Sequence, residues 1–174
     1  MTTNSNRLLV IILSFFTQLA FSQKSMQGLG SNPIYIIDSV KTSSDDMLKV
    51  NPNTVTLVNV LSKQEALGKF GDSAKDGVVY VETINFVKRR YWDYFKSKGS
   101  NTKLINKIRD YRELKFILND TPLTDANVGK LHQVNDETLE KFLIIKKKEL
   151  RKKYSIKDKK FGIVVKAKIR EQMK

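Results

Sequence analysis

VNPNTVTLVNVLSKQEALGK (residues 50–69) and VNDETLEKFLIIKKKELRKK (residues 134–153) are two stretches of this chain that align without a gap. Six positions are identical between them, and the apolar positions around the identities also correspond. Self-similarity at a fixed offset is typical of a repeated structural unit. The alignment therefore predicts that the chain contains two diverged copies of one small unit.

The flanking residues predict the same order of elements in both copies: a β-branched strand, a short helical turn, an apolar strand, a two-turn helix and a last strand. In the first copy these elements are expected at Ile34–Ile37, Asp45–Leu48, Val55–Leu61, Gln64–Phe70 and Gly77–Thr83. In the second copy they are expected at Lys115–Leu118, Asp125–Val128, Leu139–Ile145, Lys148–Tyr154 and Gly162–Ile169. The predicted fold class is α+β, with two small β-α-β units rather than one long sheet.

Two details of these units are expected from residue type. The strands Val55–Leu61 and Leu139–Ile145 have apolar residues on both faces, which is typical of a strand at the centre of a sheet. Gly77 and Gly162 align with each other at the start of the last strand when the alignment of the two stretches is shifted by one residue. We expect each of these glycines to supply a positive φ where the strand begins.

The connector between the copies, residues 84–114, has the periodicity of two helices. Each half places its apolar residues on one helical face, and these residues are Val87, Tyr91, Tyr94 and Phe95, then Leu104, Ile108 and Tyr111. Lys98–Asn101 is expected to end the first helix. The spacing predicts a helical hairpin that packs against one or both of the flanking units, 33–83 and 115–170.

Several segments of the first copy follow a recognisable order: Pro33–Asp38, then Val60–Lys63, then Phe70–Gly71 and, after five intervening residues, Gly77–Thr83. This order resembles the latter part of the plug domain of TonB-dependent outer-membrane receptors, especially the carbohydrate-uptake class. The second copy resembles the same region as a diverged repeat. The resemblance implies a plug-like fold in a Gram-negative envelope and a role as a periplasmic interaction module.

The chain also departs from that receptor family. Ser39 stands where the family has glycine, and Ala74 replaces a loop glycine. A receptor of this class needs a barrel of many strands of about ten residues each, and a chain of 174 residues is too short to supply it. Gated transport is therefore not expected.

The N-terminal residues have the features of a secretory signal peptide. Arg7 precedes the apolar run 8–16, and Ala20 and Ser22 stand where a signal peptidase reads small residues. Cleavage after Ser22 would remove residues 1–22 and leave the mature protein in the periplasm or at the outer membrane. The alternative is a single membrane anchor, which normally needs about 20 apolar residues, whereas polar residues interrupt this run.

The composition offers few groups for catalysis. The chain has no Cys and one His, so thiolate nucleophiles, disulfides and Cys-based metal sites are excluded. Asp45 and Asp46 could ligate calcium, although an adjacent acidic pair is more typical of a helix N-terminus. We therefore expect a non-enzymatic protein with no cofactor and no metal site. A hydrolase that uses two carboxylates is the remaining catalytic alternative.

The positive charge gathers at the C-terminal end. The net charge is +14, and residues 146–174 carry thirteen Lys and Arg against three acidic residues. This basic end, which includes Lys152 and Lys153, could bind an anionic envelope component such as lipopolysaccharide or acidic polysaccharide. The alternative is a solvated face that keeps the protein soluble.

A second candidate binding surface lies in the connector, where Trp92 stands next to Arg89 and Arg90. The three residues form either a cation–aromatic docking spot or a packing contact with a neighbouring unit. The leading functional interpretation is an exported module that binds an envelope protein partner through its sheets or this connector. Export argues against nucleic acid as the partner.

Overall fold

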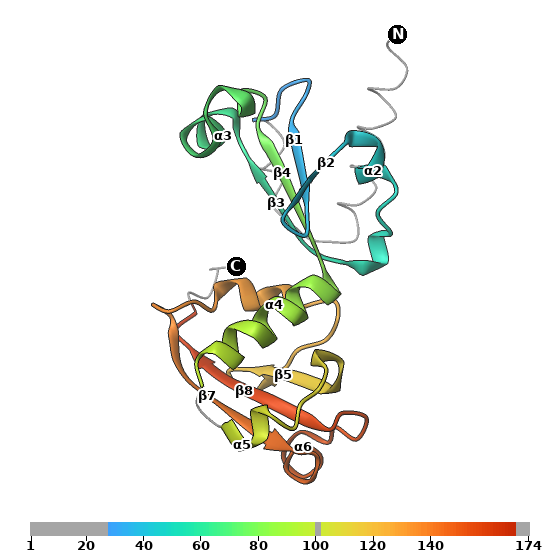
Figure 1. Cartoon of the computed structure of the whole chain (residues 1–174), viewed down its shortest axis with the longest axis vertical. Helices are drawn as coiled ribbons and strands as arrows, with labels where there is room; N and C mark the ends of the chain where they lie inside the picture. The colour runs from blue at the N-terminus through green and yellow to red at the C-terminus, as the bar shows by residue number, and fades with distance from the viewer. Residues whose placement is uncertain (1–27, 100–101, 170–174) are drawn as a thin grey trace. The chain divides into compact units, whose positions relative to one another are not determined.

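The computed structural model of the protein describes residues 28–99 and 102–169 (Figure 1). The signal peptide expected at 1–22 lies outside the described residues. Within the two described ranges, no helix has the length and apolar character that crossing a membrane requires. The chain divides after Thr83 into two compact units, and each unit is described separately below.

The first unit is a four-stranded mixed sheet with short helices. Its elements are β1 (Ile34–Ile37), β2 (Val40–Thr42), α2 (Ser44–Leu48), the 3₁₀ helix η2 (Pro52–Thr54), β3 (Val55–Leu61), α3 (Lys63–Phe70), the 3₁₀ helix η3 (Gly71–Ala74) and β4 (Val78–Thr83). The strand order is β2-β1-β4-β3. β1 runs parallel to β4, and the two outer strands are antiparallel to their neighbours.

The second unit begins with a long helix and contains a second four-stranded mixed sheet. Its elements are α4 (Ile84–Ser97), α5 (Thr102–Ile105), the 3₁₀ helix η4 (Tyr111–Glu113), β5 (Leu114–Leu118), β6 (Thr121–Pro122), the 3₁₀ helix η5 (Val128–Gln133), β7 (Leu139–Lys146), α6 (Lys147–Tyr154) and β8 (Phe161–Ala167). The strand order is β6-β5-β8-β7, and β5 runs parallel to β8. The expected mixed α+β fold class is therefore confirmed.

The two sheets have the same strand order and the same pairing register. Val58 pairs with Val81 in the first sheet, and Phe142 pairs with Val165 in the second. Phe142 and Val165 follow Val58 and Val81 by the same number of residues that separates the two aligned stretches. The outer strand also has a register irregularity at the same place in each unit, after Val55 in β3 and after Leu139 in β7.

Each unit closes its first hairpin with the same turn. Asp38–Ser39 and Asn119–Asp120 both have two successive positive φ angles, which is the conformation of a type I′ turn. The first side chain of each turn then bonds the end of the parallel strand. Asp38 accepts hydrogen bonds from the N–H and hydroxyl of Thr83, at 2.7 Å each. Asn119 accepts a hydrogen bond from the N–H of Ala167 at 3.0 Å and donates one to its carbonyl at 2.9 Å.

The apolar strands β3 and β7 lie at the edges of their sheets, so the expectation that they are central is wrong. β7 is apolar on both faces because helices cover both faces of its sheet. Ile144 of β7 packs into the core beneath α4. The next residue, Ile145, packs with Leu150 of α6 on the opposite face. Two-sided burial therefore does not require two strand neighbours.

The two glycines at the last strand do different things. Gly77 precedes β4 with a φ of +91°, as expected. Gly162 lies inside β8, where its φ is not positive and where the register makes it the counterpart of Val78. The prediction that Gly162 corresponds to Gly77, through a one-residue shift of the alignment, is therefore wrong.

Gly162 instead makes room for a helix residue. In the first unit the helix residue Ala66 is small and the strand residue Val78 beneath it is large, and both are 0% exposed. In the second unit the sizes are exchanged, because Leu150 is large and Gly162 has no side chain. A Cβ added at Gly162 would lie 2.6 Å from Leu150 Cδ2. The helix and the strand thus compensate each other in volume.

Helix α4 belongs to the core of the second unit. Its residues Val87, Tyr91, Trp92 and Phe95 are buried against the sheet and against η5. The spacing had placed Tyr94 rather than Trp92 on the buried face. The buried face is wider than one stripe: α4 contacts η5 as well as the sheet, and Trp92 is among the residues of this core.

The second arm of the expected helical hairpin is only one turn long, Thr102–Ile105. Ile108 is buried as expected, but Ile105 is buried in place of Leu104, and the chain between Ile105 and Ile108 is a tight turn. Asp110 then accepts a hydrogen bond from Arg112 N–H at 2.8 Å, which starts η4 instead of continuing the helix. A helix this short has little stability without capping or packing.

Candidate functional site

The five residues expected to bind a partner fall on opposite faces of the second sheet. Arg89, Arg90 and Trp92 belong to α4, which packs on the face formed by Phe116, Leu118, Ile163 and Val165. Lys152 and Lys153 belong to α6, which packs on the face formed by Ile117 and Val164. Figure 1 shows α4 and α6 on opposite sides of this sheet. These residues therefore cannot form one surface.

Trp92 does not form a docking spot. It is 6% exposed and packs within the core of the second unit. Arg89 is exposed, and its guanidinium lies 6.0 Å from the centre of the Phe86 ring. Arg90 lies 5.2 Å from the ring centres of both Phe86 and Tyr91. The arginines thus stack on rings of their own helix, and the indole is inaccessible.

A shallow depression of about 450 Å³ lies beside Arg90, between α4 and residues 134–137. On its wall, the Tyr94 hydroxyl donates a hydrogen bond to Asp136 at 2.8 Å, and Lys98 Nζ lies 2.6 Å from the same carboxylate. Loss of solvation, followed by this hydrogen bond, raises the pKa of Tyr94 to about 12. A tyrosine that acts as a base needs a lowered pKa, so the pair is suited to structure rather than to catalysis.

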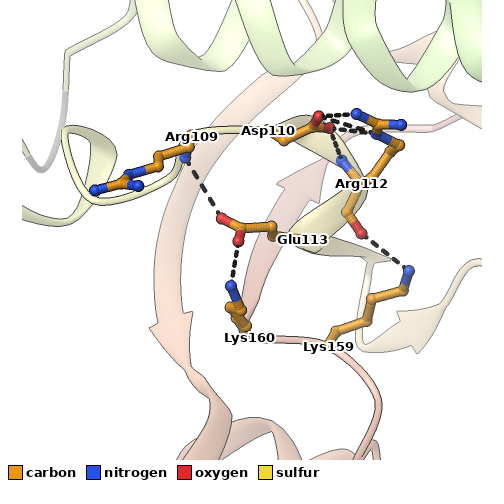
Figure 2. Close-up of polar contacts among 6 residues, drawn as sticks. All are labelled: Arg109, Asp110, Arg112, Glu113, Lys159 and Lys160. Atoms are coloured by element: carbon orange, nitrogen blue, oxygen red, sulfur yellow. Dashed lines mark hydrogen bonds and ion pairs between the residues drawn. The ribbon is translucent and has the colours of Figure 1, made fainter.

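Many cations of the basic end have partners inside the fold. Lys160 pairs with Glu113, and Lys159 Nζ donates to the backbone oxygen of Arg112 at 3.0 Å. Figure 2 shows this cluster, in which Arg112 in turn binds Asp110 through its guanidinium. The hydrogen bonds from Arg112 hold the pKa of Asp110 at about 2. The cluster joins η4 to the chain that leads into β8, and two of its cations, Arg112 and Lys160, are paired with acidic side chains.

Asp120 neutralises part of the basic end in a second place. Lys166 pairs with Asp120 at 2.5 Å, and Lys153 reaches the same residue at 3.5 Å. Lys153 Nζ also lies 5.1 Å from the centre of the Tyr154 ring. Of the two lysines expected to bind a partner, Lys153 therefore has internal partners.

The unpaired positive charge concentrates on α6. Within the described part of the chain, four exposed side chains of this helix make no ion pair and no hydrogen bond: Lys147, Lys148, Arg151 and Lys152. Of these, Lys152 was expected from the sequence and the other three were not singled out. A comparison of charge between the two aligned stretches would have identified these residues, because the corresponding positions of α3 are mostly uncharged.

The outer edge of β7 is a further feature that the sequence did not indicate. In an antiparallel ladder, alternate residues turn their backbone N–H and C=O groups away from the partner strand. Lys146 faces outward, because its N–H donates to the Glu149 carboxylate at 3.1 Å. By alternation, Phe142 and Ile144 face outward too. Among the described residues these two have no backbone partner on the outer side of β7.

No protein-family model, curated protein or solved structure shows a significant match to this chain.

Across the described ranges, no three His, Cys, Asp or Glu side chains lie close enough together to hold a metal ion. Asp46, one half of the acidic pair considered for calcium, is paired with Lys49 at 2.7 Å.

Proposed function

We propose that this chain is an exported, non-enzymatic protein of a Gram-negative envelope, built from two diverged copies of a plug-like unit, and that it binds a protein partner. The repeated strand order, the shared register and the matching type I′ turns support descent of both units from one ancestor. The exchanged sizes at Ala66–Val78 and Leu150–Gly162 support it independently. The resemblance to TonB-dependent receptor plugs supports the envelope setting.

The partner binds by strand addition along the outer edge of β7. The observation that carries this proposal is the pair of outward-facing residues, Phe142 and Ile144, whose outer backbone groups lack partners among the described residues. An unpaired strand edge is a template for an extended segment of another chain. β7 is eight residues long, so it can pair with such a segment over most of its length.

The other sheet edges are less suitable for this role. β2 and β6 have three and two residues, and short edge strands offer few hydrogen bonds. β3 is longer, but the chain that precedes β1 already meets its end, where Lys63 N–H donates to the Gly28 carbonyl at 3.0 Å. Strand addition is therefore assigned to β7.

Two substitutions of Phe142 test the proposal as a matched pair. Phe142→Pro and Phe142→Ala both remove the ring that packs 5.0 Å from Phe95, measured between ring centres. Only Phe142→Pro also removes the outward N–H, which an edge strand tolerates. We expect the tagged chain from Gln23 onward to capture an envelope protein in the unsubstituted and Phe142→Ala forms, at low and high salt.

The Phe142→Pro form should capture several-fold less of the same protein. Equal capture by the proline and alanine variants would contradict strand addition at β7. Circular dichroism of both variants checks that each remains folded.

A further inference from the structure

Helix α6 carries far more charge than its position in the fold requires. It has five basic residues and one acidic residue among its eight residues. The corresponding helix of the first unit, α3, has the same length and also follows the edge strand, yet it carries two basic residues and one acidic residue. Each helix packs on its sheet through one fully buried residue, Ala66 or Leu150. The same packing is thus achieved without the additional cations.

The additional cations also repel one another on the helix surface. Lys147 and Arg151 are four residues apart, as are Lys148 and Lys152, so like charges are neighbours on the exposed surface. No acidic side chain among the described residues pairs with any of these four. Neutralisation by an external anion would remove this repulsion.

An exposed apolar side chain lies on the same side of the sheet. Leu143 of β7 is 52% exposed. It pairs with Val164, which packs against Leu150 of α6 on the face that this helix covers. An exposed cationic helix beside an exposed apolar side chain is the combination that peripheral membrane proteins use, since the charges contact headgroups and the apolar group enters the interface.

We propose that the exposed face of α6, together with Leu143, docks on a lipid surface that carries phosphate groups. The four unpaired cations are complementary to the negative headgroups, and an exposed helix can meet several headgroups at once without a cleft. A soluble polyanion would satisfy the cations but would gain nothing from Leu143. The four cations lie on α6, and Leu143 of β7 contributes its side chain, whereas strand addition uses the outward backbone groups of Phe142 and Ile144. Either proposal can therefore fail without the other.

Vesicle co-sedimentation tests the proposal. The chain from Gln23 onward is mixed with vesicles of phosphatidylcholine, with or without phosphatidylglycerol. Each cation close to an anionic surface strengthens binding about fivefold. We therefore expect a variant with Lys147, Lys148, Arg151 and Lys152 all changed to Gln to bind phosphatidylglycerol vesicles at least about a hundredfold more weakly. Binding should also fall steeply as salt is raised.

A control of equal charge change separates the α6 face from net charge. Its four substitutions, all to Gln, are at exposed lysines of the same unit: Lys96, Lys103, Lys107 and Lys130. We expect the fold-decrease in vesicle affinity of the control to be less than about a tenth of the fold-decrease of the α6 variant. Equal loss in both variants, or no binding of phosphatidylglycerol vesicles by the unsubstituted chain, would overturn the proposal.

Leu143→Ser distinguishes a lipid surface from a soluble polyanion. This variant should bind phosphatidylglycerol vesicles several-fold more weakly and should bind soluble polyphosphate as the unsubstituted chain does. Tight polyphosphate binding together with vesicle binding that is insensitive to Leu143→Ser would overturn the lipid assignment. Circular dichroism of each variant confirms that these exposed substitutions leave the fold intact.

Discussion

The exchanged residue sizes beneath α3 and α6 lead to a strong prediction about stability. Leu150 and Gly162 of the second unit occupy the positions that Ala66 and Val78 occupy in the first. The two pairs contain the same number of side-chain carbons, differently distributed. Leu150→Ala and Gly162→Val, made separately, should each destabilise the second unit. Made together, they install the arrangement of the first unit and should largely cancel.

The expected magnitudes follow from the packing. Leu150 is fully buried, so Leu150→Ala should lower the free energy of unfolding by about 3 kcal/mol. Gly162→Val places its Cβ 2.6 Å from Leu150 Cδ2 and 3.1 Å from Ile145 Cγ1, and overpacking of this kind costs about 2 kcal/mol. The double variant conserves volume, so its loss should stay below about 1.5 kcal/mol. The coupling free energy between the two sites is therefore at least about 3 kcal/mol.

Urea unfolding followed by tryptophan fluorescence measures these values. Trp92 is the chain's single tryptophan and is buried in the core of the second unit. Its fluorescence therefore reports the unfolding of that unit. A double variant that loses the sum of the two single losses would refute the reasoning, because it would mean that Leu150 and Gly162 do not share one packing site.

Two further predictions concern a turn and a titrating side chain. Ser39 has a φ of +70° in a type I′ turn, so Ser39→Gly should raise the free energy of unfolding of the first unit by about 0.5–1 kcal/mol; thermal unfolding that is unchanged or at lower temperature would contradict this. The raised pKa of Tyr94, about 12, belongs to the folded state, so its contribution to stability is present below pH 10 and is lost as the pH rises towards 12. Asp136→Asn removes the negative charge beside the hydroxyl and should lower the pKa of Tyr94 in a spectrophotometric titration, but loss of solvation should keep it above 10.

The sequence predicted several of the elements well because their signals are local, although the helical turn expected at Asp125–Val128 is found at Val128–Gln133. The bounds expected for β1 and β3 agree with the structure, since each strand is a β-branched run that turn-forming residues delimit. The helices α3 and α6 each begin one residue earlier than expected. In both, a glutamate side chain accepts a hydrogen bond from the N–H of the residue before the helix, which explains the earlier start.

The remaining errors arise from contacts between distant residues. The periodicity of α4 could not show that the helix also contacts η5 and that Trp92 is part of the core. The cation count of the basic end could not show which lysines meet an acid, because Asp120 and Glu113 come from elements far from their partners in sequence. The position of β7 at an edge was hidden because helices on both faces make its residues apolar.

The measurement that tests strand addition most directly is amide hydrogen exchange along β7. In the free protein, the N–H groups of Phe142 and Ile144 should exchange much faster than those of Leu143 and Ile145, which face β8. In complex with the captured partner, the amides of Phe142 and Ile144 should become protected. Slow exchange at these two positions in the free protein, or unchanged exchange in the complex, would contradict the proposal that this edge binds the partner.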